Sequence, residues 1–180
     1  PCTVTVTATD AGGNTGTQVV SVTIQDVNEF SPEFGDGATA TATPNENQQA
    51  VGTYAASDAD GTATQTYSIL TAAQNAASVD HDLFSVAGGG VLTFQASPNY
   101  EDAGCGAGDN SNTCAVVIQV TDGANTDTIT VTVNVQDVNE AAPVFTAGET
   151  GTSTPNEGTT AAGTFAATDT DGTATQTYSI

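Results

Sequence analysis

The chain has 180 residues and a net charge of −21, because it holds 21 Asp and Glu residues, one His and neither Lys nor Arg. This charge argues against binding nucleic acid or an anionic membrane surface, since both carry the same sign. No stretch approaches the roughly 18 apolar residues that a membrane-spanning helix needs. Without basic side chains the carboxylates must be solvated, hydrogen-bonded or metal-bound, and adaptation to high salt is another explanation for so much acid.

Along the chain, alternation of β-branched and polar residues predicts a series of short strands. The clearest covers 128–135, where Val and Ile alternate with Thr and Asn. The others are expected around Val4 and Val6, around Val20, Val22 and Ile24, and at 51–55, 64–69, 83–86, 91–94 and 115–120. Clusters of Gly, Asp and Asn indicate turns between them, and 72–80 has room for a helical turn at most. About seven short strands in about 110 residues predict an all-β fold, a seven-strand Greek-key β-sandwich.

The sequence also contains an internal repeat. The pentapeptide Gln-Asp-Val-Asn-Glu at 25–29 returns unchanged at 136–140, an offset of 111 residues, and a Pro-x-Phe step follows each copy. At the same offset, Pro-Asn-Glu at 44–46 returns at 155–157, and 57–69 returns at 168–180 with 11 of 13 residues identical.

This offset predicts tandem units of about 111 residues. We expect the C-terminal part of one repeat at 1–28, a complete repeat at 29–139 and the N-terminal part of a third repeat at 140–180. A chain that starts and stops within repeats is expected to be a piece of a longer array.

The cysteines favour an oxidising compartment. Cys105 and Cys114 flank a loop that is short enough for one disulfide to close it. Cys2 lies eight residues before Asp10, as Cys114 lies eight before Asp122, so Cys2 is the repeat equivalent of Cys114. A disulfide in each unit implies an extracellular location. Two inert thiols are the alternative, and zinc is disfavoured because no second Cys pair or nearby His completes a ligand set.

The ordered set of motifs resembles the cadherin repeats. That family's linker reads Asp-x-Asn-Asp/Glu-x-x-Pro-x-Phe, and both copies here fit it. Its other motifs are matched in family order, over the whole chain, by Asn45-Glu46-Asn47, Asp58-Ala59-Asp60, Phe84 and Val86, Gly90, Leu92 and Thr93, Asn99-Tyr100-Glu101 and Val120-Thr121-Asp122-Gly123. The near-identity of neighbouring repeats favours a bacterial-type tandem array.

The resemblance implies three Ca²⁺ ions at each junction between repeats. The ligands that it implies at the second junction are Glu46, Asn99, Glu101, Asp137, Asn139, Glu140, Asp169 and Asp171. Those at the first junction are Asp26, Asn28, Glu29, Asp58, Asp60 and Asp122, and its upstream ligands are expected to precede residue 1. Such oxygens suit Ca²⁺, and carboxylates this close repel one another without a cation.

Three positions depart from the family pattern. Asn99 stands where the family usually has Asp, which removes one charge, and Phe30 and Ala141 replace the last Asn of the linker. The last change costs little if that position binds through its backbone carbonyl. We expect either the affinity of an extracellular module, roughly 10⁻⁴ to 10⁻³ M, or poorer occupancy of one site.

The resemblance implies a calcium-dependent cell-adhesion or surface-interaction array, stiffened by Ca²⁺ at its junctions. Its partner would be another copy of itself, another cell-surface protein or a polysaccharide. The alternative is a passive spacer that presents an enzyme or carbohydrate-binding module of a larger secreted protein. The absence of Trp excludes the Trp-exchange dimerisation of vertebrate junctional cadherins within this chain.

We do not expect an enzyme. His81 is the only histidine and lies between Asp80 and Asp82 in a polar segment, without a Ser or Cys nucleophile context. Gly88-Gly89-Gly90 lacks the Lys of a phosphate-binding loop and indicates a turn. The acids recur once per repeat, whereas a catalytic site would be expected once.

Overall fold

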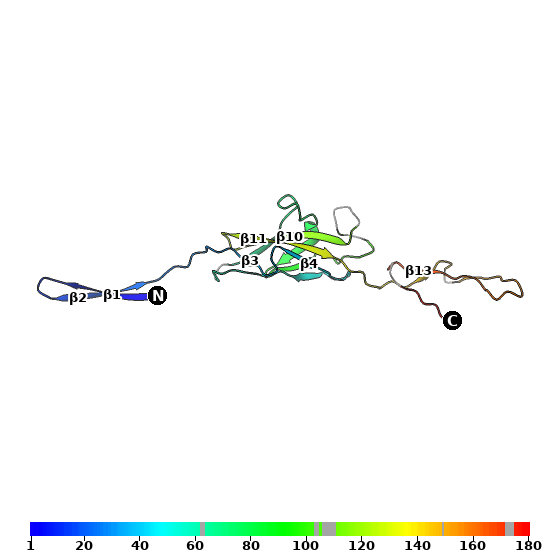
Figure 1. Cartoon of the computed structure of the whole chain (residues 1–180), viewed down its shortest axis with the longest axis horizontal. Helices are drawn as coiled ribbons and strands as arrows, with labels where there is room; N and C mark the ends of the chain where they lie inside the picture. Colours follow the sequence, from blue (N-terminus) through cyan, green and yellow to red (C-terminus); the bar gives the residue numbers. More distant parts are fainter. Residues whose placement is uncertain (62–63, 103–104, 106–110, 149, 172–174) are drawn as a thin grey trace.

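The computed structural model describes residues 1–61, 64–102, 105, 111–148, 150–171 and 175–180. The molecule is elongated: a β-sandwich lies in the middle, a hairpin extends from one end, and the residues after about 140 extend from the other (Figure 1). Among the described residues the only helical element is a turn of 3₁₀ helix, η1 (His81–Leu83), and no helix is long and apolar enough to cross a membrane. The prediction of an all-β fold is confirmed.

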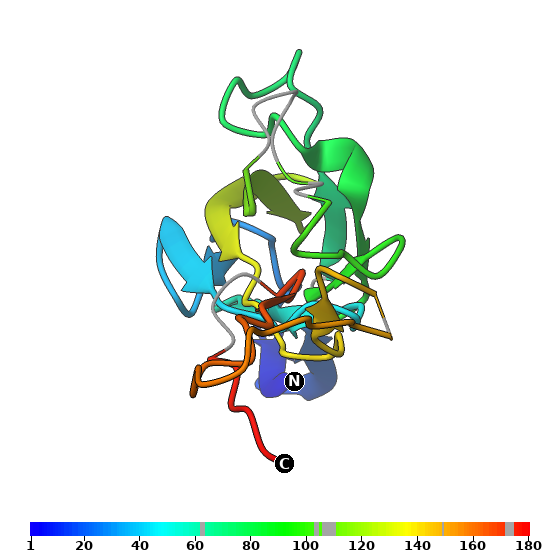
Figure 2. The same cartoon turned by 90° about the vertical axis from the view of Figure 1, so that its right-hand side faces the viewer.

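Two sheets form the sandwich, which Figure 2 shows end-on. The first sheet has the order β4 (Thr39–Ala42), β11 (Thr126–Asn134), β10 (Thr113–Thr121) and β7 (Thr66–Ile69), with only β4 and β11 parallel. The second has the order β5 (Ala50–Thr53), β9 (Val91–Phe94) and β8 (Phe84–Ala87), and next to it β6 (Ala56–Ser57) pairs with β3 (Glu33–Phe34). Counting β3 with β4 and β5 with β6 as split strands gives the seven strands expected.

Alternate residues of β10 and β11 fill the interior. Because successive side chains of a strand point to opposite faces, every second residue points inward. These inward residues are fully buried: Val116, Ile118, Val120, Ile129, Val131 and Val133. They belong to one core with Leu92 and the ring pair of Phe84 and Phe94, whose centroids are 4.7 Å apart. The Thr/Val alternation of the sequence is therefore the alternation of surface and core.

Val117 departs from this alternation. It lies on the outer face of β10 and is fully buried, because the segment after β7 runs along the strand there. Leu70 N donates to Val117 O (2.9 Å), and Val117 N donates to Ser78 Oγ (3.0 Å). Ala115 N donates to the buried Asp80 through Oδ2 (2.7 Å). This segment forms hydrogen-bonded turns, as its polar composition indicates, and it extends the edge of the sheet beyond β7.

The repeats seen in the sequence reappear as matching strand pairs. In the hairpin of β1 (Cys2–Thr9) and β2 (Thr15–Val22), Cys2 pairs with Val22 as Cys114 pairs with Val133. All residues of β1 and β2 are exposed. Likewise β12 (Val144–Phe145) pairs with β13 (Ala167–Thr168) in the register that β3 makes with β6. The domain boundaries at 28 and 139 stay a prediction.

Most predicted strands are present, with shifted ends. Ile24 lies beyond the end of β2, Leu83 belongs to η1, and Val135 follows β11. The strands β3, β6, β12 and β13 were not predicted, because two residues are too few to show alternation, and β4 was not predicted because its Thr and Ala residues include no large apolar side chain.

The structure joins Cys105 and Cys114 in a disulfide, and Cys2 is exposed and has a free thiol. Both bonded cysteines are buried in the core. The residues between them at 106–110, part of the loop expected to be closed, lie outside the described residues.

Candidate metal centre

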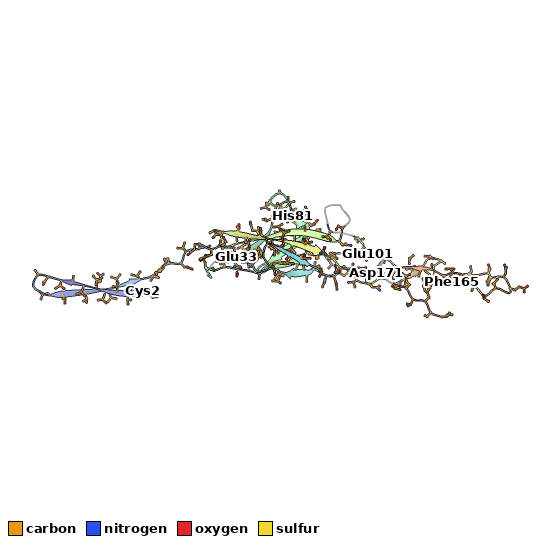
Figure 3. All side chains as sticks on the ribbon, in the orientation of Figure 1. Cys2, Glu33, His81, Glu101, Phe165 and Asp171 are labelled. Carbon is orange, nitrogen blue, oxygen red and sulfur yellow. A yellow bond between two sulfur atoms is a disulfide. The ribbon has the colours of Figure 1, made fainter. Side chains whose placement is uncertain are left out.

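The carboxylates of the second junction gather where the sandwich meets the segment after β11. Figure 3 shows Glu101 and Asp171 close together at this place. Two groups have carboxylate oxygens that all lie within 4.8 Å of one another: Glu46 with Glu101 and Glu140, and Glu101 with Asp137 and Asp171. Glu101 belongs to both. The two groups draw on four separate segments of the chain.

Glu46 connects two of these segments through hydrogen bonds. Glu46 is only 3% exposed. Tyr100 N donates to Glu46 Oε2 (2.8 Å), and Val138 N donates to Glu46 Oε1 (2.8 Å). The first bond fixes the segment that carries Glu101, and the second fixes the linker. The buried Glu46 carboxylate, which accepts hydrogen bonds from two backbone N–H groups, therefore holds the Glu101 segment and the linker next to each other.

Asn47 positions the linker from the other side. Its side chain donates from Nδ2 to Glu140 Oε1 (2.9 Å), and its backbone N donates to Pro98 O (2.9 Å). Its φ of +62° is left-handed, a conformation that Asn adopts more readily than most other non-glycine residues. The sequence motif contained Asn47, but only Glu46 was identified as a ligand. The tolerance of Asn for positive φ was the available signal.

The segment that carries Asp169 and Asp171 is held by a pair of hydrogen bonds, and the equivalent pair occurs at the first junction. Ala141 N donates to Asp171 Oδ2 (2.8 Å), and Asp171 N donates to Asp169 Oδ1 (3.1 Å). At the first junction Phe30 N donates to Asp60 Oδ2 (2.8 Å), and Asp60 N donates to Asp58 Oδ1 (2.9 Å). At both junctions, the second Asp of the Asp-x-Asp motif thus accepts a hydrogen bond from the residue after the linker pentapeptide. Asp171 is 2% exposed.

The first junction is organised around an amide. When the Asn28 side chain is oriented to satisfy its neighbours, Nδ2 donates to Asp60 Oδ2 (3.1 Å) and to Asp122 Oδ2 (3.0 Å). Asp58 Oδ2 is buried and has no hydrogen-bond partner. Asp26 and Glu29 are exposed. Among the described residues, no group of three close carboxylates includes a residue of this junction.

The electrostatics of the two junctions differ. Hydrogen bonds lower the pKa of Asp122, chiefly one from the backbone N–H of Asn125, followed by others that include one from Ala124. A hydrogen bond from its own backbone N–H lowers the pKa of Glu101, but desolvation and the charges of Glu46, Glu140 and Asp137 together raise it above the ordinary glutamate value. The Glu101 carboxylate therefore sits in a field that favours a proton or another cation.

Three further residues singled out in the sequence, Asn99, Asn139 and His81, lie outside the two groups of close carboxylates. Asn99 Oδ1 accepts a hydrogen bond from Glu101 N (2.9 Å), so its side chain shapes the turn that carries Glu101. Asn139 is exposed within the linker. His81 contacts Ser78 O through Nδ1 (3.0 Å) and Asp82 Oδ1 through Nε2 (3.3 Å). The prediction of a non-enzymatic role stays a prediction.

No family model and no curated protein matches the sequence, but the fold is similar to that of several solved structures. Human CDH23 EC21-23 aligns over 93% of this chain and 53% of its own, at a TM-score of 0.57 and 17% identity. Mouse protocadherin-24 EC1-3 aligns over 95% and 56%, at 0.54 and 20%. The human desmocollin-1 ectodomain aligns over 77% and 26%, at 0.51 and 23%.

The chain has the cadherin-repeat fold. It spans between 26% and 56% of the length of these cadherin structures. The resemblance found in the sequence motifs and the likeness found in the coordinates thus agree on one architecture. Bacterial-type origin stays a prediction.

Proposed function

We propose that the chain is a stretch of a tandem cadherin-like array whose junctions bind Ca²⁺. The observation that carries the proposal is the pair of carboxylate groups that share Glu101. They bring acids from separate segments within 4.8 Å of one another in a chain with no Lys or Arg to neutralise them. Ca²⁺ takes six to eight oxygen ligands with flexible geometry, and an all-oxygen set of this kind suits it.

The remaining features of the junctions support the same ion. At the second junction the ion would be held by Glu46, Glu101, Asp137, Glu140 and Asp171. Further ligands would come from the same segments, namely Asn99, Asn139 and Asp169. At the first junction the ion would be held by Asp26, Asn28, Glu29, Asp58, Asp60 and Asp122. The buried Asp58 Oδ2 without a hydrogen-bond partner is an oxygen that a cation would satisfy. Desolvation and the charges of Glu46, Glu140 and Asp137 together raise the pKa of Glu101, and a bound cation would offset the repulsion from those charges.

The consequence of binding is mechanical. Glu46 and Glu101 belong to the sandwich, whereas Asp169 and Asp171 belong to the segment after the linker. Ca²⁺ supplies charge neutralisation and bonds shared between these segments. Without it the carboxylates repel one another and the linker is free to bend; with it, consecutive repeats form a stiff rod.

Such a rod serves as an extracellular adhesion or surface-interaction array, and the Cys105–Cys114 disulfide favours that compartment. The partner would be another copy, a cell-surface protein or a polysaccharide. A second role, a calcium-stiffened spacer, is favoured by the near-identity of the repeats, since 11 of 13 residues match between 57–69 and 168–180. Repeats this alike favour length over distinct binding faces. Aggregation of beads coated with the protein in calcium supports self-adhesion, and its absence favours a heterologous partner or the spacer.

Melting and scattering test the calcium junction itself. If the affinity is near 10⁻⁴ M, then 10 mM Ca²⁺ is about 100 times Kd and stabilises a folded site by about 2.7 kcal/mol. The midpoint of thermal unfolding should therefore rise by about 10 °C relative to chelator. The maximum dimension from small-angle scattering should increase as the junction straightens. Identical melting and scattering curves in calcium and in chelator, at matched ionic strength, would sink the proposal.

A further inference from the structure

Three contacts link Tyr100 and Cys105, on either side of Glu101, to β10 and the two residues before it. The disulfide joins Cys105 to Cys114, and Cys105 N donates to Ser111 O (3.1 Å). The third link is the side chain of Asn112, whose Nδ2 donates to Tyr100 O (2.9 Å). This last hydrogen bond is made at the residue adjacent to Glu101.

Asn112 also contacts the strand that leads into the linker. Its backbone carbonyl accepts a hydrogen bond from Val135 N (2.9 Å), two residues before Asp137. One partly buried residue therefore connects two ligand-bearing segments. Tyr100 extends the connection, because Tyr100 N donates to Glu46 Oε2 while Tyr100 O accepts from Asn112.

Glu101 needs such a restraint. It is exposed, and Glu46, Glu140 and Asp137 all repel its charge. On a free turn, an exposed carboxylate would move away from three like charges toward water. The bond from Asn112 to Tyr100 O opposes this movement at the backbone. Its strength does not depend on the charge of Glu101.

We propose that Asn112 is the positioning residue for Glu101 and thereby sets the calcium affinity of the second junction. The inference rests on the proposed calcium function, because it concerns the same site. Asn112 does not bind the ion; it holds the turn so that Glu101 stays within reach of both carboxylate groups before the ion arrives. Residues that orient metal ligands without contacting the metal typically contribute about 10- to 100-fold in metal affinity.

The test compares Asn112→Ala with the wild-type chain by following backbone amide signals in a nuclear magnetic resonance titration with CaCl₂. The amides of Tyr100 and Val138 report the second junction, and the amides of Phe30 and Asp60 report the first. We expect about tenfold weaker binding at the second junction and unchanged binding at the first. Asn112→Leu, which keeps a similar size and the same charge but removes the donor, should weaken the second junction in the same way.

Two controls separate positioning from loss of fold. Asn75→Ala removes an asparagine whose Oδ1 accepts from Ala77 N (3.0 Å) in the segment after β7, and it should change neither junction. The midpoint of unfolding in chelator should be nearly the same for Asn112→Ala and wild type. Equal affinity of Asn112→Ala and wild type at the second junction overturns this inference and leaves the calcium function standing. Absence of saturable binding in the wild type overturns both.

Discussion

The two junctions share one linker pentapeptide but differ in the carboxylates that meet around it. At the second junction Glu101 lies within two groups of close carboxylates, whereas at the first the Asn28 amide donates to Asp60 and Asp122. The pentapeptide therefore does not gather the acids by itself. At the second junction the close groups also include Glu46 and Glu101, which lie outside the pentapeptide.

The largest effect is expected from Glu101, because it belongs to both groups. Glu101→Gln should remove most of the calcium-dependent rise in melting temperature that the second junction provides, a loss of about 10 °C in 10 mM Ca²⁺. In chelator the variant should melt slightly above wild type, since it loses one repelling charge. Differential scanning calorimetry measures both.

The matched control for this variant is Asp82→Asn. The Asp82 side chain is 91% exposed and lies beside His81, away from the ligand segments. This variant removes the same charge from the chain, so it should keep the full calcium response. Equal responses of the two variants would mean that total charge, rather than the Glu101 site, governs the effect.

A smaller effect is expected from the pair Asp171→Asn and Asp60→Asn, which alters equivalent positions at the two junctions. Each carboxylate accepts one backbone hydrogen bond from the residue after the pentapeptide. Asp171→Asn should weaken only the second junction and Asp60→Asn only the first, each by roughly tenfold, the size of one lost charged ligand contact of about 1.4 kcal/mol. A residue-resolved calcium titration checks this, and loss at both junctions from either variant would contradict independent sites.

The smallest effect is expected at Asn47, which holds Glu140 from a left-handed backbone conformation. Asn47→Gly tolerates the positive φ without strain but removes the hydrogen bond to Glu140. It should therefore weaken calcium binding a few-fold, since one hydrogen bond contributes about 0.5–1.5 kcal/mol. Asn47→Ala should add a loss of about 1 kcal/mol in folding stability, because Ala resists positive φ. Chemical denaturation in chelator distinguishes the two, and equal stability of both would show that the backbone carries no strain.

Much of the fold was predictable because the core residues repeat along β10 and β11. Val116, Ile118 and Val120 stand at every second position, and this period is visible in the sequence. The two-residue strand β3 was not visible, because Phe34 is buried through pairing with a distant β6 rather than through a local pattern. The burial of Val117 was hidden for the same reason, since Ser78 reaches it from another part of the chain.

The acidic ligands were predictable because their charge and their recurrence at a fixed offset mark them. Asn47 and Asn112 were missed because they act through hydrogen bonds to other residues of the junction. No repeat or charge marks such a residue, and only the folded chain places its amide beside Glu140 or Tyr100 O.

The most direct measurement is a residue-resolved nuclear magnetic resonance titration of the wild-type chain with CaCl₂ at constant ionic strength. The account predicts saturable shifts of the Tyr100, Val138 and Ala141 amides, which donate to Glu46 and Asp171, with a Kd of roughly 10⁻⁴ to 10⁻³ M. It also predicts weaker binding at the Phe30 and Asp60 amides of the first junction. Shifts that never saturate, or that match those produced by NaCl, would contradict it.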